Sequence, residues 1–172
     1  MSDTAADLHP GFEDFYASEH GRLVTTLLLA TGDAEIAREA TDEAFTRALQ
    51  AWRRVQHMDS PAGWTYRVAL NVVRRRGRRA ALERRLLAGR ARPAGTGVVP
   101  PPAGEAWHLV AELPDRQRTA VVLRFVADLT EVEIAKVMGV SRSTVSSTLA
   151  DATRSLGRAL AEEPQPSGDL HG

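Results

Sequence analysis

The 172-residue sequence contains no cysteine, so it can form neither a disulfide framework nor a thiolate metal site. Its five histidines are scattered, and no HExxH or similar pair of metal ligands occurs, so we expect no metal and no cofactor. No apolar run approaches the roughly 20 residues that a membrane span needs. The segment MSDTAADLHP also lacks the basic and apolar parts of a secretory signal. These absences favour a cytoplasmic protein without membrane insertion. No nucleophile–base pattern points to an enzyme.

The net charge of zero conceals a strong segregation of charge along the chain. Residues 1–60 carry 11 acidic and 5 basic side chains, and residues 93–172 carry 10 acidic and 7 basic ones. Residues 61–92 between them hold 10 arginines and one acid. An acidic block beside a strongly basic one predicts two different partner surfaces.

Residues 129–156, LTEVEIAKVMGVSRSTVSSTLADATRSL, predict two helices joined by a tight turn. Thr130 and Glu133 have the spacing of a capping box. Gly139 stands where a helix closes in the left-handed conformation, and Ser141 can cap the next helix. Helix, short turn and helix are the plan of a DNA-binding helix-turn-helix, although an αα-hairpin of an ordinary bundle fits the same signals.

Helical periodicity extends over most of the remaining chain, and no segment shows strand alternation. Helices are expected over residues 10–30, 34–52, 61 onward, 105–112 and 115–126, with a polar connection over residues 53–60. The apolar stripes expected to face the core include Ala37, Ala40, Thr41, Ala44, Phe45, Ala48, Leu49 and Trp52, then Trp64, Val68 and Val72, then Val121, Val122 and Phe125.

The segment ARPAGTGVVPPPAG, residues 91–104, is rich in proline and glycine and predicts a linker. The sequence therefore predicts an all-α fold of two small helical domains. The first covers residues 8–90. The second is a four-helix domain over residues 105–160 that contains the helix-turn-helix. A disordered tail is expected over residues 161–172.

The run Arg74-Arg75-Arg76-Gly77-Arg78-Arg79 concentrates positive charge on one short helical segment. These side chains would repel one another without an anionic partner, and the guanidinium fork suits phosphate because it donates two parallel hydrogen bonds. The concentration of arginine favours nucleic-acid binding over a merely solvated basic face.

Three stretches, DAEIAREATDEAFTRALQAW, WTYRVALNVVRRRGRR and LPDRQRTAVVLRFVADLTEVEIAKVMGVS, follow one another in this order. Together they resemble the extracytoplasmic-function group of bacterial sigma factors, compact members of the sigma-70 family that keep the second and fourth conserved regions. The resemblance implies a non-enzymatic protein that binds core RNA polymerase through the β′ clamp helices and the β flap. It also implies recognition of −10 and −35 promoter elements, a monomer when free, and an anti-sigma factor as a possible partner.

The resemblance also implies which side chains carry these contacts. It assigns polymerase binding to Arg38, Glu39, Asp42, Glu43, Phe45 and Arg47, with Asp42 standing where the family usually has an amide. It assigns the −10 element to Trp64, Arg67, Asn71, Arg74, Arg75, Arg76, Arg78 and Arg79, together with the loop at residues 57–60. Asn71 matches the residue that contacts an extruded base, whereas Trp64 reads mainly as a core anchor.

The −35 element is assigned to the last helix, where the sequence departs from the family pattern. The positions are Ser141, Arg142, Ser143, Thr144, Ser146, Ser147, Ala150, Asp151 and Arg154. The family commonly has basic residues at the positions of Ser146, Thr148 and Asp151, so we expect a weak or unusual −35 contact. The main electrostatic attraction for DNA is then expected from the arginine-rich helix.

Two other functions fit parts of the pattern. One is a helix-turn-helix transcriptional regulator, which would usually be dimeric. The other is a sigma-derived protein–protein adaptor, for which the weakly basic last helix is the motivation.

Overall fold

The structure, a computed structural model, describes residues 10–86 and 105–162, and this part of the chain is helical with no β-strand. The helices are α1 Phe12–Thr31, α2 Ala34–Gln50, α3 Trp52–Val55, α4 Pro61–Leu86, α5 Glu105–Glu112, α6 Asp115–Phe125, α7 Glu131–Met138 and α8 Arg142–Glu162. The predicted all-α class is confirmed. The predicted linker lies outside the described residues, as does the predicted tail beyond residue 162, and residues 161–162 belong to α8. None of the described helices is long and apolar enough to cross a membrane.

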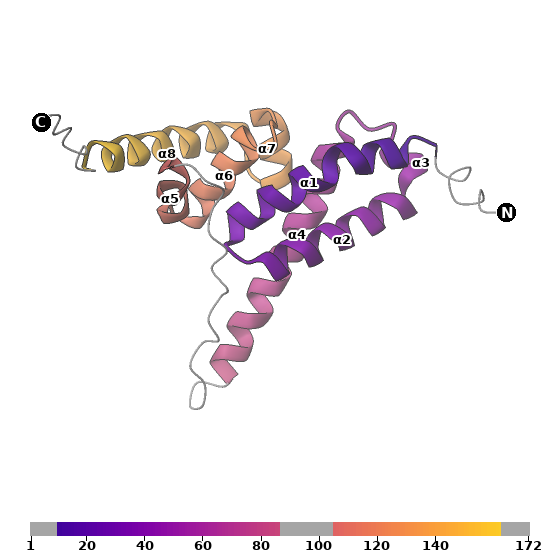
Figure 1. The fold of residues 1–172 in the computed structure, drawn as a ribbon, viewed down its shortest axis with the longest axis horizontal. Helices are drawn as coiled ribbons and strands as arrows, with labels where there is room; N and C mark the ends of the chain where they lie inside the picture. The colour runs from indigo at the N-terminus through magenta and orange to yellow at the C-terminus, as the bar shows by residue number, and fades with distance from the viewer. Residues whose placement is uncertain (1–9, 87–104, 163–172) are drawn as a thin grey trace, which may run out of the picture.

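The first half of the fold is built from α1, α2 and α4 (Figure 1). Gly32 ends α1 in the left-handed conformation with φ 69°. The Asp33 carboxylate then caps α2, accepting the N–H groups of Glu35 and Ile36 at 2.9 and 3.0 Å. The buried face of α2 is made of small side chains, which lets α1 and α4 approach its backbone closely: Ala37, Ala40, Thr41, Ala44 and Ala48. The C-terminal half of α4 extends away from the other helices.

The inward face of α4 differs from the predicted stripe of residues four apart. Tyr66, Ala69 and Leu70 are buried together with Val72, while Trp64 and Val68 are only partly buried. The reason is that α4 packs against α2 on one side and α7 on another, so its buried surface is wider than one row of side chains.

Three further expectations about burial need correction. The predicted polar connection over residues 53–60 overlaps α3, in which Val55 is buried; Trp52 is buried as expected, and its Nε1–H donates to the Pro10 carbonyl at 3.0 Å. Leu49 is exposed on α2. Phe125 is 72% exposed because Val122 and Leu123 take the inward positions at the end of α6.

The helix-turn-helix forms as its capping residues predict. The Thr130 hydroxyl accepts the Glu133 N–H at 3.3 Å while the Glu133 carboxylate accepts the Thr130 N–H at 2.8 Å, which completes the capping box. Gly139 ends α7 with φ 70°. The Ser141 hydroxyl accepts the Thr144 N–H at 3.1 Å and so starts α8.

The two halves of the chain share one hydrophobic core in this structure. A single buried cluster joins Leu27 of α1 and Tyr66 of α4 to Leu123 of α6 and Ile134 of α7. The Arg118 Nε–H donates across the contact to the Ala30 carbonyl at the end of α1, at 3.0 Å. The two halves therefore meet in a packed interface, which no local pattern in the sequence predicts.

Candidate nucleic-acid interface

A hollow of about 750 Å³ lies beside the loop at residues 57–60, which the family resemblance assigned to the −10 element. Trp64 and Arg67 of α4 line one side of it. Val132, Glu133 and Lys136 of α7 line the other. Arg54, Arg67 and Lys136 bring positive charge to its lining, and the half-buried indole of Trp64 brings an aromatic surface. Such a combination can stack an unpaired base and hold its phosphate.

Asn71, predicted to contact an extruded base, is not among the residues that line this hollow. It is exposed farther along α4, where its side-chain oxygen lies 3.4 Å from an Arg74 nitrogen. The structure thus brings Trp64 and Arg67 to the loop and leaves Asn71 outside.

Ser60 and Glu133 join the loop to α7. The Ser60 hydroxyl oxygen accepts the Gly63 N–H at 3.0 Å, which starts α4, and the Glu133 side chain of α7 lies nearby, close to Gly63. Burial by itself would raise the pKa of Glu133, but the hydrogen bonds from Ser60 and Thr130 outweigh it, and the pKa lies below its ordinary value. An ionised carboxylate from the second half of the chain therefore lies beside the loop at residues 57–60.

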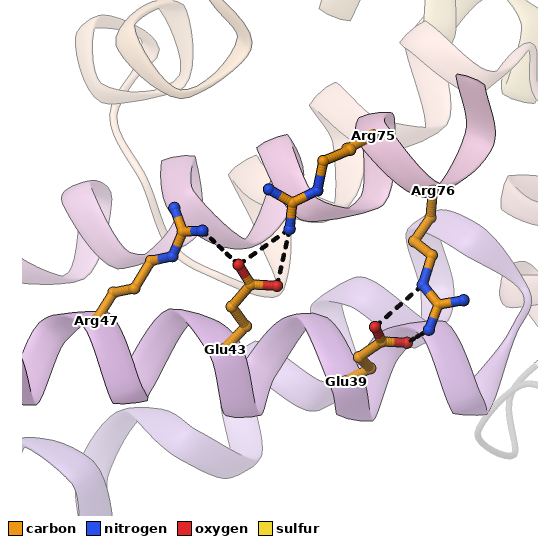
Figure 2. A network of polar contacts seen from close by, with 5 residues as sticks. All are labelled: Glu39, Glu43, Arg47, Arg75 and Arg76. Carbon is orange, nitrogen blue, oxygen red and sulfur yellow. Dashed lines mark hydrogen bonds and ion pairs between the residues drawn. The ribbon is translucent and has the colours of Figure 1, made fainter. Parts of the chain in front are cut away.

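Arg74, Arg75 and Arg76 already have partners within the fold. Arg74 donates to the Met138 carbonyl at the C-terminal end of α7, at 3.0 Å, where the helix dipole favours a cation. Arg75 donates through one nitrogen to both oxygens of Glu43 at 2.9 and 3.0 Å. Arg76 binds the Glu39 carboxylate through two nitrogens, its Nε lying 3.0 Å from one oxygen (Figure 2).

The anionic partners that the sequence led us to expect for this run come, for Arg75 and Arg76, from α2 of the same chain. The missed signal was the spacing of Glu39 and Glu43, which places both carboxylates on one face of that helix. Among the described residues, Arg67, Arg78 and Arg85 are exposed without an ion pair, while Arg79 lies 3.4 Å from Glu83.

The face of α2 assigned to polymerase divides into two layers. Arg38 and Asp42 are exposed, whereas Glu39 and Glu43 are half-buried and point toward α4 (Figure 2). The Arg75 hydrogen bond lowers the pKa of Glu43 against the opposing effect of burial, and the charge of Arg47, 2.5 Å away, lowers it further. Phe45 does not belong to the face: it is 3% exposed and packs in an aromatic cluster with Phe12, Phe15, Tyr16 and His20.

The predicted −35 face of α8 is exposed and nearly neutral. Exposed on it are Ser141, Arg142, Ser143, Ser146, Ser147, Ala150, Asp151 and Arg154, with Thr144 half-buried. Both arginines have acidic neighbours, since Arg142 lies 3.4 Å from Glu131 and Arg154 binds Asp151. Serine hydroxyls can hydrogen-bond to donors or acceptors on base edges but distinguish bases poorly. Because both arginines are paired, this face also has little net positive charge for binding the phosphates of a duplex.

Comparisons with known proteins agree on both halves. Residues 15–83 match the family model for sigma-70 region 2, and residues 103–156 match that for sigma-70, region 4. The chain is 28% identical over 162 residues to the ECF RNA polymerase sigma factor SigK of Mycobacterium tuberculosis (strain H37Rv), covering 87% of this chain and 85% of SigK. SigK of Mycobacterium bovis (strain AF2122/97) gives the same values of 28%, 87% and 85%.

Two solved structures have a similar fold. The sigma factor RpoE from Bartonella quintana, in complex with the anti-sigma factor NepR, aligns with a TM-score of 0.72 at 15% identity, covering 89% of this chain and 98% of RpoE. CnrH, in complex with the cytosolic domain of CnrY, aligns with a TM-score of 0.60 at 21% identity, covering 93% of this chain and 96% of CnrH.

Proposed function

We propose, because the chain belongs to the extracytoplasmic-function group of the sigma-70 family, that it binds core RNA polymerase and guides it to its own set of promoters. Sigma factors direct promoter-specific transcription initiation. The protein then acts as an initiation factor in the cytoplasm and performs no catalysis of its own.

The observation that carries the proposal is the hollow at residues 57–60, with the aromatic face of Trp64 beside Arg54 and Arg67. Single-stranded DNA needs a stacking surface and a cation for its backbone, and both meet there. The exposed arginines farther along α4 extend the positive surface for phosphate: Arg78, Arg79 and Arg85. The serine-rich face of α8 supplies the contact with the duplex −35 element.

Core polymerase docks, in this proposal, on the outer face of α2 at Arg38 and Asp42, with a second contact between the β flap and the C-terminal half. An anti-sigma factor is a further proposed partner. It is supported by the structure of similar fold in which RpoE is bound to the anti-sigma factor NepR.

The test is holoenzyme formation followed by run-off transcription. The folded chain is expected to co-elute with core polymerase in gel filtration and to start transcription on genomic fragments, beginning with the region upstream of its own coding sequence. Asp42→Arg should weaken co-elution. Asp14→Arg, the same charge reversal at an exposed position of α1, should not. Absence of a holoenzyme with the chain in excess would refute the proposal.

The same preparations separate the two other candidate functions. A dimer in gel filtration of the free chain would favour the helix-turn-helix regulator. A holoenzyme that leaves the −35 region unprotected in a footprint would favour the adaptor, for which the near-neutral face of α8 is the supporting observation.

A further inference from the structure

The two ion pairs between α2 and α4 have the geometry by which arginine binds phosphate. Arg76 meets the Glu39 carboxylate with two nitrogens on two oxygens, as a guanidinium meets a phosphate group (Figure 2). The Arg75 nitrogen lies between the two oxygens of Glu43 at 2.9 and 3.0 Å. Each carboxylate occupies the hydrogen-bonding positions that a nucleic-acid phosphate would otherwise take.

These pairs lie at the surface, where solvent and anions can reach them. The side chains of Arg75 and Arg76 are 57% and 48% exposed, and those of Glu43 and Glu39 are 28% and 41% exposed. Exposed ion pairs contribute little to stability because solvent screens them and ordering long side chains costs entropy. A phosphate can therefore displace the carboxylates, at a modest cost that lowers its affinity.

We propose that Arg75 and Arg76 form a latent phosphate-binding surface for single-stranded nucleic acid, which Glu39 and Glu43 occupy and weaken in the unbound chain. The inference rests on the proposed binding of DNA by α4, but it needs no polymerase. A protein partner that takes these two carboxylates on α2 would release the two arginines for phosphate.

The mechanism affects the salt dependence of binding as well as the affinity. An arginine that leaves a carboxylate for a phosphate exposes a negative group, which attracts a cation from solution and reduces the net release of ions. Replacing the carboxylate by an amide removes that opposing effect. The slope of log K against log salt should then steepen by about 0.7 for each arginine released.

The experiment measures binding of the full-length chain to fluorescent oligo(dT) by anisotropy at several salt concentrations. Glu39→Gln and Glu43→Gln preserve side-chain size and are each expected to tighten binding about two- to fivefold, within the range for an exposed pair. Asp42→Asn is the matched control: it removes the same charge from the same helix at an exposed position with no ion pair. Its smaller effect measures the long-range contribution of charge, and circular dichroism verifies that every variant is folded.

A second arm tests whether the gain passes through the arginine. In an Arg75→Gln background, Glu43→Gln should give no more gain than Asp42→Asn does. Equal effects of Glu39→Gln, Glu43→Gln and Asp42→Asn would overturn the inference, as would a gain that persists without Arg75. Absence of oligo(dT) binding by both the wild type and the double variant E39Q/E43Q would overturn it too. Failure to form a holoenzyme would refute the sigma-factor proposal without changing these results.

Discussion

Glu133 serves two structural purposes with one carboxylate. It completes the capping box of α7 with Thr130, and it lies near Ser60 of the loop beside the hollow, whose hydroxyl helps to lower its pKa. The capping role follows from sequence spacing alone, whereas the contact with Ser60 depends on α7 packing against the start of α4.

The lowered pKa of Glu133 predicts a pH-dependent contribution to stability. Because its pKa in the folded chain lies below the ordinary 4.5, the ionised carboxylate stabilises the fold above that pH, and the contribution is lost as the pH falls through the folded value. Glu133→Gln keeps an oxygen that can accept the Thr130 N–H but removes the negative charge at the start of α7, so it should lower the free energy of unfolding by about 0.3–1 kcal/mol at pH 7. The gap between wild type and variant should shrink below pH 4.5.

Urea denaturation of both proteins at pH 7 and at acidic pH measures this gap. Glu43, whose pKa is also lowered, is present in both proteins, so its own titration cancels in the comparison. A gap that stays constant with pH would show that the charge of Glu133 has no part in stability.

At the scale of the element, α4 combines structural and surface arginines along one helix. Arg74 is half-buried and reaches the end of α7, Arg75 and Arg76 reach α2, and Arg67 and Arg78 are exposed without an ion pair within the described residues. These residues are all arginine, but their side chains contact different neighbours because successive side chains of a helix point about 100° apart.

We therefore expect Arg67→Ala to affect mainly DNA binding and Arg74→Ala to affect mainly the free energy of unfolding. Arg67→Ala should weaken binding of single-stranded DNA and reduce the salt slope by about 0.7, while the free energy of unfolding stays within about 0.5 kcal/mol of wild type. Arg74→Ala should lower the free energy of unfolding by about 1 kcal/mol, because it removes a hydrogen bond from a charged donor to the Met138 carbonyl.

Anisotropy titration and urea denaturation of the same preparations give both quantities. If Arg67→Ala lowered stability and left DNA binding unchanged, the proposed roles of these two side chains would be contradicted.

At the scale of the molecule, α7 lines one side of the hollow beside residues 57–60 with Val132, Glu133 and Lys136. Because this hollow lies between the two halves, we expect binding of polymerase and promoter to widen it by separating them. The natural absence of cysteine permits site-specific labelling without background.

A chain labelled at Thr46→Cys on α2 and Thr153→Cys on α8, both exposed positions, should show a decrease in energy transfer when core polymerase and promoter DNA are added. A control pair within the first half, Thr46→Cys and Gly77→Cys, should not change. An unchanged signal from the first pair in an active holoenzyme would mean that the halves stay packed during initiation.

Much of the fold could be predicted from the sequence because its signals are local. Each of these signals depends on residues within one or two turns of a helix: the capping box at Thr130, the left-handed Gly139, the caps at Asp33 and Ser141, and the small-residue face of α2. The family resemblance likewise depends on residue order, and the exposed positions of the last helix follow from its periodicity.

Tertiary structure alone decided what the side chains contact across elements. Phe45 lies in the core because α1 brings Phe12 and Phe15 over it, and Trp64 lines a hollow because α7 packs beside it. The arginine run predicted a positive surface, but only the packing of α4 on α2 paired Arg75 and Arg76 with Glu43 and Glu39. Charge and periodicity are properties of the chain, whereas the choice of ionic partner depends on which helices lie within a few ångströms of each other.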